Sequence, residues 1–388
     1  MDLTFTEEHE LIRKTARDFA VEKLAPGVAE RDEKGLYPQA QVRELAELGF
    51  FGMFIPEKYG GAGLDSISYC IAIEELSRID ASVGVIISVT NSLAAHPILK
   101  FGTEEQKQKF LVPLASGQKL GGFCLTEPGA GSDAAAQTTV AVKDGDHYMV
   151  TGAKHFVTSG KNGDLFVVMV MTDKSKGGKG TSSLVIEQGK PGMTVQPGEH
   201  KLGIRGSDTH AIVFDGCRVP VAHRLGNEGD GLKVALTALD SGRMGIGAQA
   251  LGIAQGALDA SLEYVHQRQQ FGKYLKDFQA TQFKLADMET RIQAARLLLY
   301  QSALKKDRNE RYSKEVAMAK VYASETAMWV ATQAVQIFGG YGFTTEYPVE
   351  RAMRDAKITE IYEGTSEVQR MVIAANLLAD WAKTHAGK

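Results

Sequence analysis

The sequence predicts an α+β fold that is mainly α-helical, because the spacing of its apolar residues changes twice along the chain. Apolar residues recur every three or four positions in the first third, every two positions in the middle, and every three or four positions again in the last third. We therefore expect an N-terminal α-helical domain at 1–120, a middle antiparallel β domain at 121–227 and a C-terminal four-helix bundle domain at 228–388. With 388 residues, 44% of them hydrophobic, the chain can bury a large core.

The first third predicts helices separated by clear breaks. A first helix stops at Pro26, and a second follows around Leu45. The glycine-rich loop 56–63 interrupts the helical pattern, as several neighbouring glycines must. Thr103 and Gln106 have the spacing of a capping box, so another helix is expected to begin there.

The middle third predicts strands. Val140 and Val142 alternate with polar residues, and the Asp-Gly-Asp sequence at 144–146 is typical of a hairpin turn. Further apolar runs, separated by glycine-rich and lysine-rich loops, lie at 165–171, 183–186 and 211–214.

The last third predicts long helices, one of them with an apolar face that includes Phe283, Met288 and Ile292. The letters GIGAQA at 245–250 fit a dinucleotide-binding fingerprint, but both flanks are typical of helix and no strand precedes them. We therefore interpret these small residues as sites of close helix packing.

Composition excludes several classes of partner. The net charge of −3, with both signs interspersed, provides no basic surface for nucleic acid or an anionic membrane. The N-terminus lacks a signal peptide, and no uninterrupted apolar stretch reaches membrane-spanning length, so we expect a cytoplasmic protein without membrane insertion. Cys70, Cys124 and Cys217 are few and far apart, so neither disulfides nor a metal site is expected.

One short sequence points to acid–base chemistry. Glu363 is followed at once by Gly364 within IYEGTSE, and its neighbours are aromatic, small or hydroxylic. A glycine lets another molecule approach the backbone, and a partly dried carboxylate becomes a stronger base. On composition alone, a Glu that caps a helix or forms an ion pair at its end is more frequent by roughly three to one. The assignment of Glu363 therefore depends on the rest of the chain.

Four further motifs fit a flat cofactor that carries phosphate. The loop LTEPGAGSD at 125–133 offers hydroxyls and backbone N–H groups at a strand end, and FVTSG at 156–160 places an aromatic ring beside hydroxyls. Arg268 lies at a helix end, where an arginine suits a pyrophosphate, and the glycines of QIFGGYG at 336–342 end another helix. Singly, each motif is more often a turn, a surface ion pair or a helix stop.

In this order, the sequences TEPGAGSD, FVTSG, RQQFGK, QIFGGYGF and IYEGTSEVQR closely resemble those of the acyl-CoA dehydrogenase flavoenzymes, and the PEKYGG loop before them does so too. The resemblance spans essentially the whole chain and is strongest to the short-chain, butyryl-type members. It implies bound FAD, an acyl-CoA substrate and transfer of electrons to an electron-transfer flavoprotein. It also favours Glu363 as a base over the structural alternative.

The resemblance implies three sets of site residues. The residues expected at the flavin ring, where Thr126 would bond to the isoalloxazine edge, are Phe123, Leu125, Thr126, Gly131, Ser132, Phe156, Val157, Thr158, Thr365 and Glu367. The FAD diphosphate and adenosine would be held by Arg268, Phe278 and Gln279, with Gln336, Gly339 and Gly340 reaching FAD from a neighbouring subunit. The substrate would contact Ser132, Asp240, Arg243, Tyr362 and Gly364. Many relatives have tryptophan where this chain has Phe156.

The implied reaction is α,β-dehydrogenation of a short-chain acyl-CoA to the trans-2-enoyl-CoA, as in fatty acid β-oxidation. Glu363 would remove the α-proton while the β-hydrogen leaves as hydride to the flavin, and the Glu363 N–H with a ribityl hydroxyl would bond to the thioester carbonyl. Some relatives carry the base immediately before the arginine that corresponds to Arg243. That position is Gly242 here, so Glu363 is the only family-type base in the sequence. Gly364 is expected to leave room for the acyl chain.

Several alternatives stay open from the sequence. A branched-chain or glutaryl-type dehydrogenase would use the same base, and so would an acyl-CoA oxidase, although known oxidases are usually longer. A non-catalytic acyl-CoA or flavin-binding scaffold of the same fold is the alternative from a different class. The resemblance also implies a homo-oligomer, with a tetramer expected.

Overall fold

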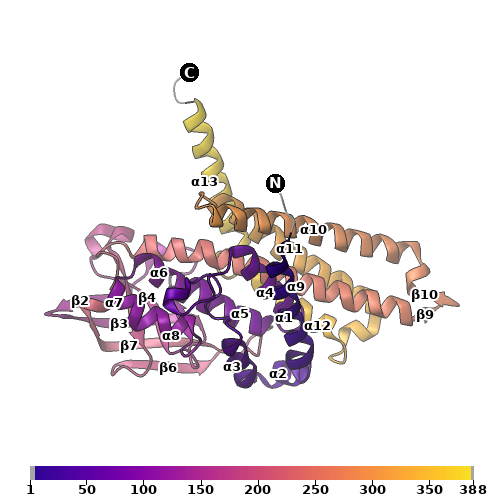
Figure 1. The fold of residues 1–388 in the computed structure, drawn as a ribbon, viewed down its shortest axis with the longest axis horizontal. Helices are drawn as coiled ribbons and strands as arrows, with labels where there is room; N and C mark the ends of the chain where they lie inside the picture. Colours follow the sequence, from indigo (N-terminus) through magenta and orange to yellow (C-terminus); the bar gives the residue numbers. More distant parts are fainter. Residues whose placement is uncertain (1–4, 386–388) are drawn as a thin grey trace.

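The computed structural model describes residues 5–385, and the ends of the first and third predicted domains, residues 1–4 and 386–388, lie outside it. Short helices come first along the chain, then a β sheet, then long helices (Figure 1). The predicted mainly helical α+β fold, with a middle β domain and helices after it, is confirmed.

The first part of the chain is helical, and its helix starts follow local capping. Thr6 and His9 form a capping box, Asp65 caps a later helix, and the predicted capping box of Thr103 with Gln106 is present. The α-helices are α1 (Glu7–Phe19), α2 (Val28–Lys34), α3 (Gln39–Glu47), α4 (Ser66–Ser77), α5 (Ala81–Val89), α6 (His96–Phe101), α7 (Glu104–Gln106) and α8 (Val112–Ala115). A short π-helical segment, η3 (Thr90–Ala95), joins α5 to α6.

One helical segment, Ala81–Phe101, is long and apolar enough to cross a membrane by length and composition. Its apolar residues are interrupted by Ser88, Asn91 and His96, so it is not an uninterrupted apolar stretch of the kind that the sequence excludes. It lies in the interior of the protein, with 94% of its most apolar window buried, so its apolar character is explained by its place in the core.

The middle part is a twisted sheet whose strand order is β6-β7-β3-β2-β4-β5-β8, with β1 beside β4. Its strands are β1 (Gly121–Cys124), β2 (Val140–Asp144), β3 (His147–Thr158), β4 (Leu165–Met171), β5 (Thr181–Glu187), β6 (Met193–Gly198), β7 (Thr209–Pro220) and β8 (Arg224–Leu225). The predicted hairpin at 144–146 joins β2 to β3. The sheet is not antiparallel throughout, because β1 pairs with β4 in parallel and β2 meets β4 in one parallel bridge. The chain enters at β1 from the helices, so β1 is not joined to β4 by a hairpin and a parallel pairing is possible.

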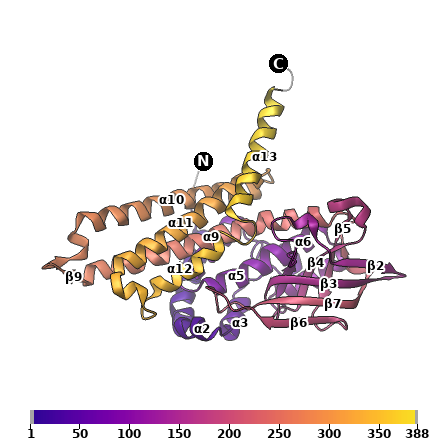
Figure 2. The ribbon, with the colours of Figure 1, turned by 180° about the vertical axis from the view of Figure 1, so that it is seen from behind.

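Long helices form the last part, and α9 is their central element (Figures 1 and 2). They are α9 (Gly231–Gln267), α10 (Gln279–Asp307), α11 (Ser313–Phe338), α12 (Pro348–Thr359) and α13 (Ser366–His385), with the small hairpin of β9 (Gln269–Gln270) and β10 (Lys273–Tyr274) between the first two. The GIGAQA letters lie inside α9, as expected. A Cβ on Gly245 would overlap the hydroxyls of Ser88 and Tyr69, so this glycine permits close helix packing. Phe283 is exposed, although the periodicity placed it on the apolar face of α10.

The N-terminal helices and the C-terminal bundle share one apolar core, which extends from Ala16 on α1 to Ala356 on α12. Smaller clusters fill the sheet and its contact with η3 and α6. The boundaries predicted at 120/121 and 227/228 stay predictions, because a shared core does not divide the chain into separate folding units.

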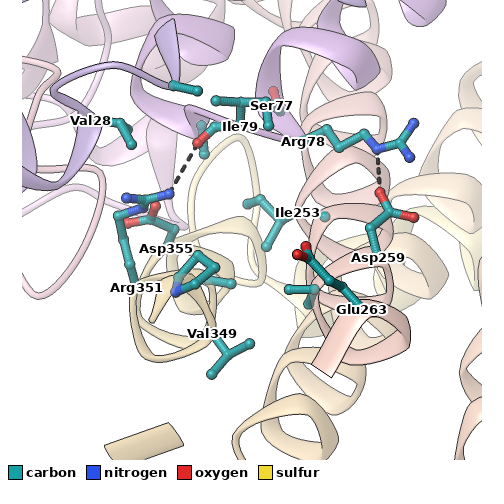
Figure 3. Close-up of a pocket in the computed structure, with 17 residues that line it drawn as sticks. Val28, Ser77, Arg78, Ile79, Ile253, Asp259, Glu263, Val349, Arg351 and Asp355 are labelled. Carbon is teal, nitrogen blue, oxygen red and sulfur yellow. Dashed lines mark hydrogen bonds and ion pairs between the residues drawn. The ribbon is translucent and has the colours of Figure 1, made fainter. Parts of the chain in front are cut away.

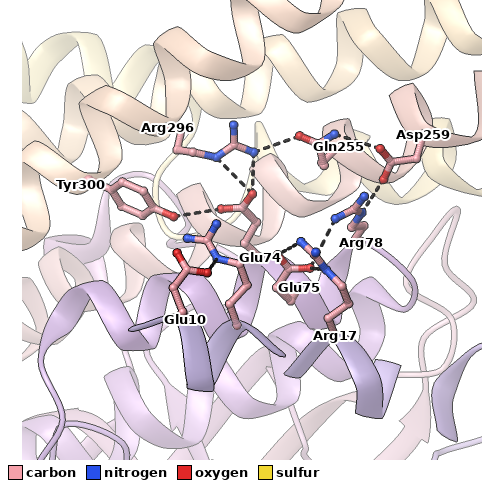
Figure 4. A network of polar contacts seen from close by, with 10 residues as sticks. Glu10, Arg17, Glu74, Glu75, Arg78, Gln255, Asp259, Arg296 and Tyr300 are labelled. Atoms are coloured by element: carbon pink, nitrogen blue, oxygen red, sulfur yellow. Dashed lines mark hydrogen bonds and ion pairs between the residues drawn. The ribbon is translucent and has the colours of Figure 1, made fainter. Parts of the chain in front are cut away.

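Buried charges cross this shared core in ion pairs (Figure 4). Glu74 on α4 accepts from Arg296 of α10 at 2.6 Å, and Arg17 of α1 donates to Glu75 at 2.7 Å. Arg78, at the end of α4, pairs with Asp259 of α9. Because each carboxylate that is buried here faces an arginine, the network fixes how α1, α4, α9 and α10 pack against one another.

A second polar junction joins all three parts of the chain at Arg354 on α12. Its guanidinium donates to Asp32 of α2 at 2.6 Å and to the Leu202 carbonyl, in the loop between β6 and β7, at 3.1 Å. The neighbouring Asp355 carboxylate accepts from the Ile204 N–H of the same loop, and burial raises the pKa of Asp355 to about 7. Arg354 therefore holds the β domain and the N-terminal helices against α12.

We predict that Arg354→Met lowers the free energy of unfolding by about 3 kcal/mol, because the buried Asp32 carboxylate loses its partner. Chemical unfolding of both proteins measures the difference. Lys357→Met on the same helix is the control, since Lys357 pairs with Glu360 at the surface and should change stability by less than about 0.5 kcal/mol. Equal effects of the two substitutions would contradict the role of Arg354.

Candidate active site

Glu363 lies in a tight turn between α12 and α13, and the backbone there is strained. Glu363 has φ +53° and Gly364 has φ +97°, both in the left-handed region that side chains disfavour. A Cβ on Gly364 would also lie 2.5 Å from Nε2 of Gln369. Glycine is therefore required by the turn itself. From the sequence alone, Gly364 is explained differently, by the room that an acyl chain needs. A strained non-glycine residue persists only where its surroundings hold it, and such residues cluster at functional sites.

Three side chains hold this turn through its carbonyl groups. Gln369 Nε2 donates to the Glu363 carbonyl at 3.2 Å and to the Gly364 carbonyl at 2.8 Å. Arg243 of α9 donates to the Glu363 carbonyl at 3.4 Å, and Lys320 of α11 donates to the Gly364 carbonyl at 2.8 Å. Within residues 5–385, the backbone N–H of Glu363 has no acceptor. The turn thus has fixed carbonyls, and the Glu363 N–H is free to donate.

One oxygen of the Glu363 carboxylate is buried and unpaired, while the residue as a whole is partly buried. Burial raises the pKa of Glu363 to about 8, although the nearby cations Lys320 and Arg243 act to lower it. Its Oε2 atom is buried and has no hydrogen-bond partner in the described part of the chain. A Cβ at Gly242 of α9 would overlap this oxygen, so the glycine at the alternative base position is what gives Glu363 its space.

The other predicted substrate residues, except Ser132, surround this turn. Tyr362 donates its hydroxyl to Gln249 of α9, and burial raises its pKa well above the ordinary value. Arg243 pairs with Asp240 at 2.6 Å. Both residues therefore already have protein partners, and Arg243 holds the turn in addition to any contact with substrate.

Thr365 and Glu367 begin α13 next to the base. The Thr365 hydroxyl accepts from the Val368 N–H at 3.3 Å, which is a local cap, and Glu367 is exposed.

The predicted flavin loop leaves strand β1 and is held from beneath by Lys154 of β3. The Lys154 ammonium is fully buried and donates to Glu127 at 2.8 Å, to the Leu125 carbonyl at 3.1 Å and to Gln137 at 3.1 Å. Burial acts to raise the pKa of Glu127, but Lys154 and the Thr138 N–H outweigh it and hold the pKa at about 2. From the sequence alone, Lys154 was not identified as a support of this loop. The available signal was that Lys154 alternates with apolar residues along β3.

The end of β3 lies directly against this loop. The His155 N–H donates to the Thr126 carbonyl at 2.8 Å, which joins the TEPGAGSD and FVTSG motifs. Phe156 is 61% exposed, an unusual state for a phenyl ring, and has φ +55°. Val157 is buried in the sheet, so its backbone is what it can offer to a cofactor. The loop tip is open, since a Cβ on Gly131 would meet nothing within 4 Å.

Segment η3 connects the flavin loop to the base. The Gly121 N–H, at the start of β1, donates to the Thr90 hydroxyl at 3.3 Å. One turn further along, Leu93 reaches Gly242, beside the Glu363 carboxylate. The structure therefore brings the β1–β3 motifs and the Glu363 turn to opposite ends of one short segment.

The remaining predicted cofactor residues lie elsewhere, at the far end of the helical bundle. Arg268, Gly339 and Gly340 line one cavity of about 560 Å³ there, and the Arg268 guanidinium lies 5.6 Å from the Tyr341 ring centre. Gln336 is exposed on the last turn of α11. Phe278 and Gln279 begin α10 nearby, outside the cavity lining. From Gly242 to the end of α9 is about 38 Å at 1.5 Å per residue, so this cavity is remote from the base.

A further cavity of about 350 Å³ lies between the end of α4, α9 and α12 (Figure 3). It is lined largely by small and apolar residues such as Ile253 and Val349, and contains none of the predicted site residues. The arginines at its edge have partners, since Arg78 bonds to Asp259 and Arg351 to the Ile79 carbonyl.

Comparison with known proteins identifies the class of enzyme. Three family models match the chain in order: the acyl-CoA dehydrogenase N-terminal domain at 6–118, the middle domain at 122–217 and the C-terminal domain at 229–378. The chain belongs to the acyl-CoA dehydrogenase family.

Within this family the similarity is high to short-chain members. The chain is 50% identical to the short-chain specific acyl-CoA dehydrogenase of Clostridium acetobutylicum, over 97% of this chain and 100% of that one. The structure of butyryl-CoA dehydrogenase from Megasphaera elsdenii matches with a TM-score of 0.96 and 51% identity, covering 97% and 100%. A chain in a structure of the electron-transferring flavoprotein of Acidaminococcus fermentans matches with a TM-score of 0.96 and 50% identity, with the same coverage.

We predict that Lys154→Met destabilises the protein by about 3 kcal/mol, because it leaves the Glu127 carboxylate buried without its cation. The double variant Lys154→Met/Glu127→Gln removes both charges and should recover at least half of that loss. Chemical unfolding of the three proteins measures this. A double variant as unstable as Lys154→Met would contradict the charge pair as the support of the loop.

Proposed function

We propose that this chain catalyses FAD-dependent α,β-dehydrogenation of a short-chain acyl-CoA, yielding the trans-2-enoyl-CoA and passing electrons to an electron-transfer flavoprotein. The observation that carries the proposal is the buried, unpaired Oε2 of the Glu363 carboxylate, with a free N–H on the same residue. The similarity to short-chain specific and butyryl-CoA dehydrogenases supports the substrate class. The similarity to a chain in an electron-transferring flavoprotein structure supports the electron acceptor.

Glu363 acts as the general base. A base is most effective when its pKa lies near the working pH, and burial places that of Glu363 at about 8 rather than near the ordinary value of 4.5. The α-proton of the thioester passes to this carboxylate, which has no competing hydrogen bond at Oε2 in residues 5–385. The free N–H of Glu363 donates to the thioester carbonyl and stabilises the enolate as it forms. Base and oxyanion donor therefore belong to one rigid turn.

The edge formed by β1 and β3 fits the flavin ring of FAD. The exposed Phe156 ring offers a flat face, Thr126 and Ser132 offer hydroxyls, and the open glycines allow a cofactor to approach the backbone. We propose that Phe123, Leu125, Gly131, Val157 and Thr158 also contact the flavin, as do Thr365 and Glu367 from the start of α13. When bound, FAD supplies the acceptor for the electrons that leave the substrate. Ser132, Asp240, Arg243, Tyr362 and Gly364 hold the acyl-CoA.

The FAD diphosphate and adenosine are held by a second copy of the chain. Arg268, Phe278, Gln279, Gln336, Gly339 and Gly340 gather at the far end of α9, farther from Glu363 than one extended FAD can reach. Two copies related by symmetry bring the far end of each bundle to the flavin edge of the other. Apolar side chains on α13 that are exposed in one chain, including Leu378 and Trp381, support a larger assembly, and we propose a homotetramer.

Branched-chain and glutaryl-type substrates are the alternatives within the family, and a panel of acyl-CoA thioesters tested for anaerobic flavin bleaching separates them from butyryl-CoA. A non-catalytic scaffold is disfavoured by the buried Glu363, since a carboxylate without a partner costs stability and serves no purpose in a scaffold. We also propose a cytoplasmic location and no insertion in the membrane, since the most apolar helical segment lies in the core.

We predict that Glu363→Gln keeps its bound FAD but loses flavin reduction by butyryl-CoA by at least about a thousandfold, because the amide cannot accept the α-proton. Anaerobic absorbance changes of the flavin measure the reaction, and the flavin-to-protein absorbance ratio measures FAD content. Near-normal bleaching in this variant would refute Glu363 as the base.

We predict that Arg268→Met weakens FAD retention by about tenfold to a hundredfold, because the diphosphate loses a charged hydrogen-bond donor. Flavin released on dilution measures this. Arg218→Met serves as the control, since the Arg218 side chain is 62% exposed on β7, and it should keep FAD as the unchanged protein does. Retention of FAD by Arg268→Met at the control level would contradict a cofactor site shared between copies.

A further inference from the structure

Lys320 is a buried cation that the reaction, as described above, does not use. It lies on α11 between small apolar neighbours and is 0% exposed. Within residues 5–385 its hydrogen bond goes to a backbone carbonyl rather than to a carboxylate, and burial lowers its pKa to about 8. An ammonium that is dry and without a carboxylate partner costs stability, so its position calls for a reason other than stability.

The Lys320 ammonium points at the turn that holds Glu363. Its Nζ lies 2.8 Å from the Gly364 carbonyl, which also accepts from Gln369 Nε2 at 2.8 Å. Since Gln369 donates to both turn carbonyls, the turn keeps an anchor when Lys320 is neutralised. Loss of the Lys320 charge can therefore be separated from loss of the turn.

The charged and titratable groups that face Glu363 come from several elements. Arg243 of α9 lies close, but its charge is offset by Asp240 at 2.6 Å. Tyr69 of α4 is buried and Tyr362 of the turn itself is partly buried, and both are neutral because loss of water contact raises their pKa values. Lys320 is thus the nearby cation that has no carboxylate paired with it. Glu325 and Glu360 also act on its charge, but more weakly than Glu363 does.

We propose that Lys320 is a positioning residue for the proposed dehydrogenation, which contacts the Glu363 turn and favours the ionised form of the base. The proposal rests on the proposed function. The ammonium favours the carboxylate form of Glu363 through space, and its hydrogen bond to the Gly364 carbonyl holds it beside the turn. The chain thereby obtains a carboxylate that burial makes basic and whose ionised form is more populated than it would be without the cation.

The test is the pH dependence of flavin reduction by butyryl-CoA in Lys320→Met. Removing the cation raises the pKa of Glu363 further, so activity, which needs the carboxylate form, should appear at higher pH, with a midpoint shifted up by about one pH unit or more. At neutral pH the rate should fall about tenfold and recover at high pH. Lys320→Arg, which keeps the charge, should restore the midpoint towards its original value.

Lys306→Met is the matched control, because Lys306 is a partly buried lysine whose pKa burial also lowers to about 8, but it donates to Ser241 rather than to the turn. It should leave the midpoint unchanged. Bound FAD and the thermal midpoint report folding, and Lys320→Met should keep both, since methionine replaces a costly buried charge. A Lys320→Met midpoint equal to that of the unchanged protein, or a Lys306→Met midpoint shifted as much, would overturn the inference. If no acyl-CoA bleaches the unchanged protein, the proposed function fails instead.

Discussion

Burying a carboxylate that has no partner is the constraint on which the rest of this structure depends. The Glu363 carboxylate is removed from water where α9, α11 and the start of α13 meet, and a lone charge would not remain ionised there. The chain responds with cations at a short distance rather than in direct contact: Arg243 and Lys320 bond to the carbonyls of the turn and leave the carboxylate oxygens free. A direct ion pair would have satisfied the charge and also lowered its basicity. The strained backbone and the glycines beside it follow from the same requirement.

Much of the fold could be predicted from the sequence, because its signals are local. Capping at Thr103, the hairpin at 144–146 and the change of apolar period depend on residues close in the chain, and the structure contains all of them. The parallel pairing of β1 with β4 could not be predicted, since it depends on where the preceding helices deliver the chain. The core shared by the N-terminal helices and the C-terminal bundle could not be predicted either, because the composition of neither part indicates that the two pack together.

The candidate site was predictable in its motifs but not in its supports. Each motif of the candidate site has hydroxyls, glycines or an aromatic ring at a place where packing alone does not need them. Lys154 and Lys320 hold those motifs from behind, and in the sequence each is a single lysine among apolar residues of a strand or helix. The reason for Gly364 was also hidden, because the φ of the turn and its contact with Gln369 are properties of the folded chain. That Arg268 lies together with Gly339 and Gly340 could be recognised only from the structure, which shows the cavity at the end of the long helix α9.

Gly242 has a consequence for how such enzymes can change over time. Its missing side chain gives Glu363 its space, and the resemblance of the sequence to the family implies that some relatives carry the base at this position. A chain with a carboxylate at both positions would have two side chains competing for one volume, whereas a chain with neither would have no base. Moving the base from the α12–α13 turn to α9 therefore takes more than one substitution. No single substitution gives an intermediate that is both well packed and active. The two positions are epistatic, and an evolutionary path between the two arrangements must pass through an inactive or repacked ancestor, or acquire both changes together.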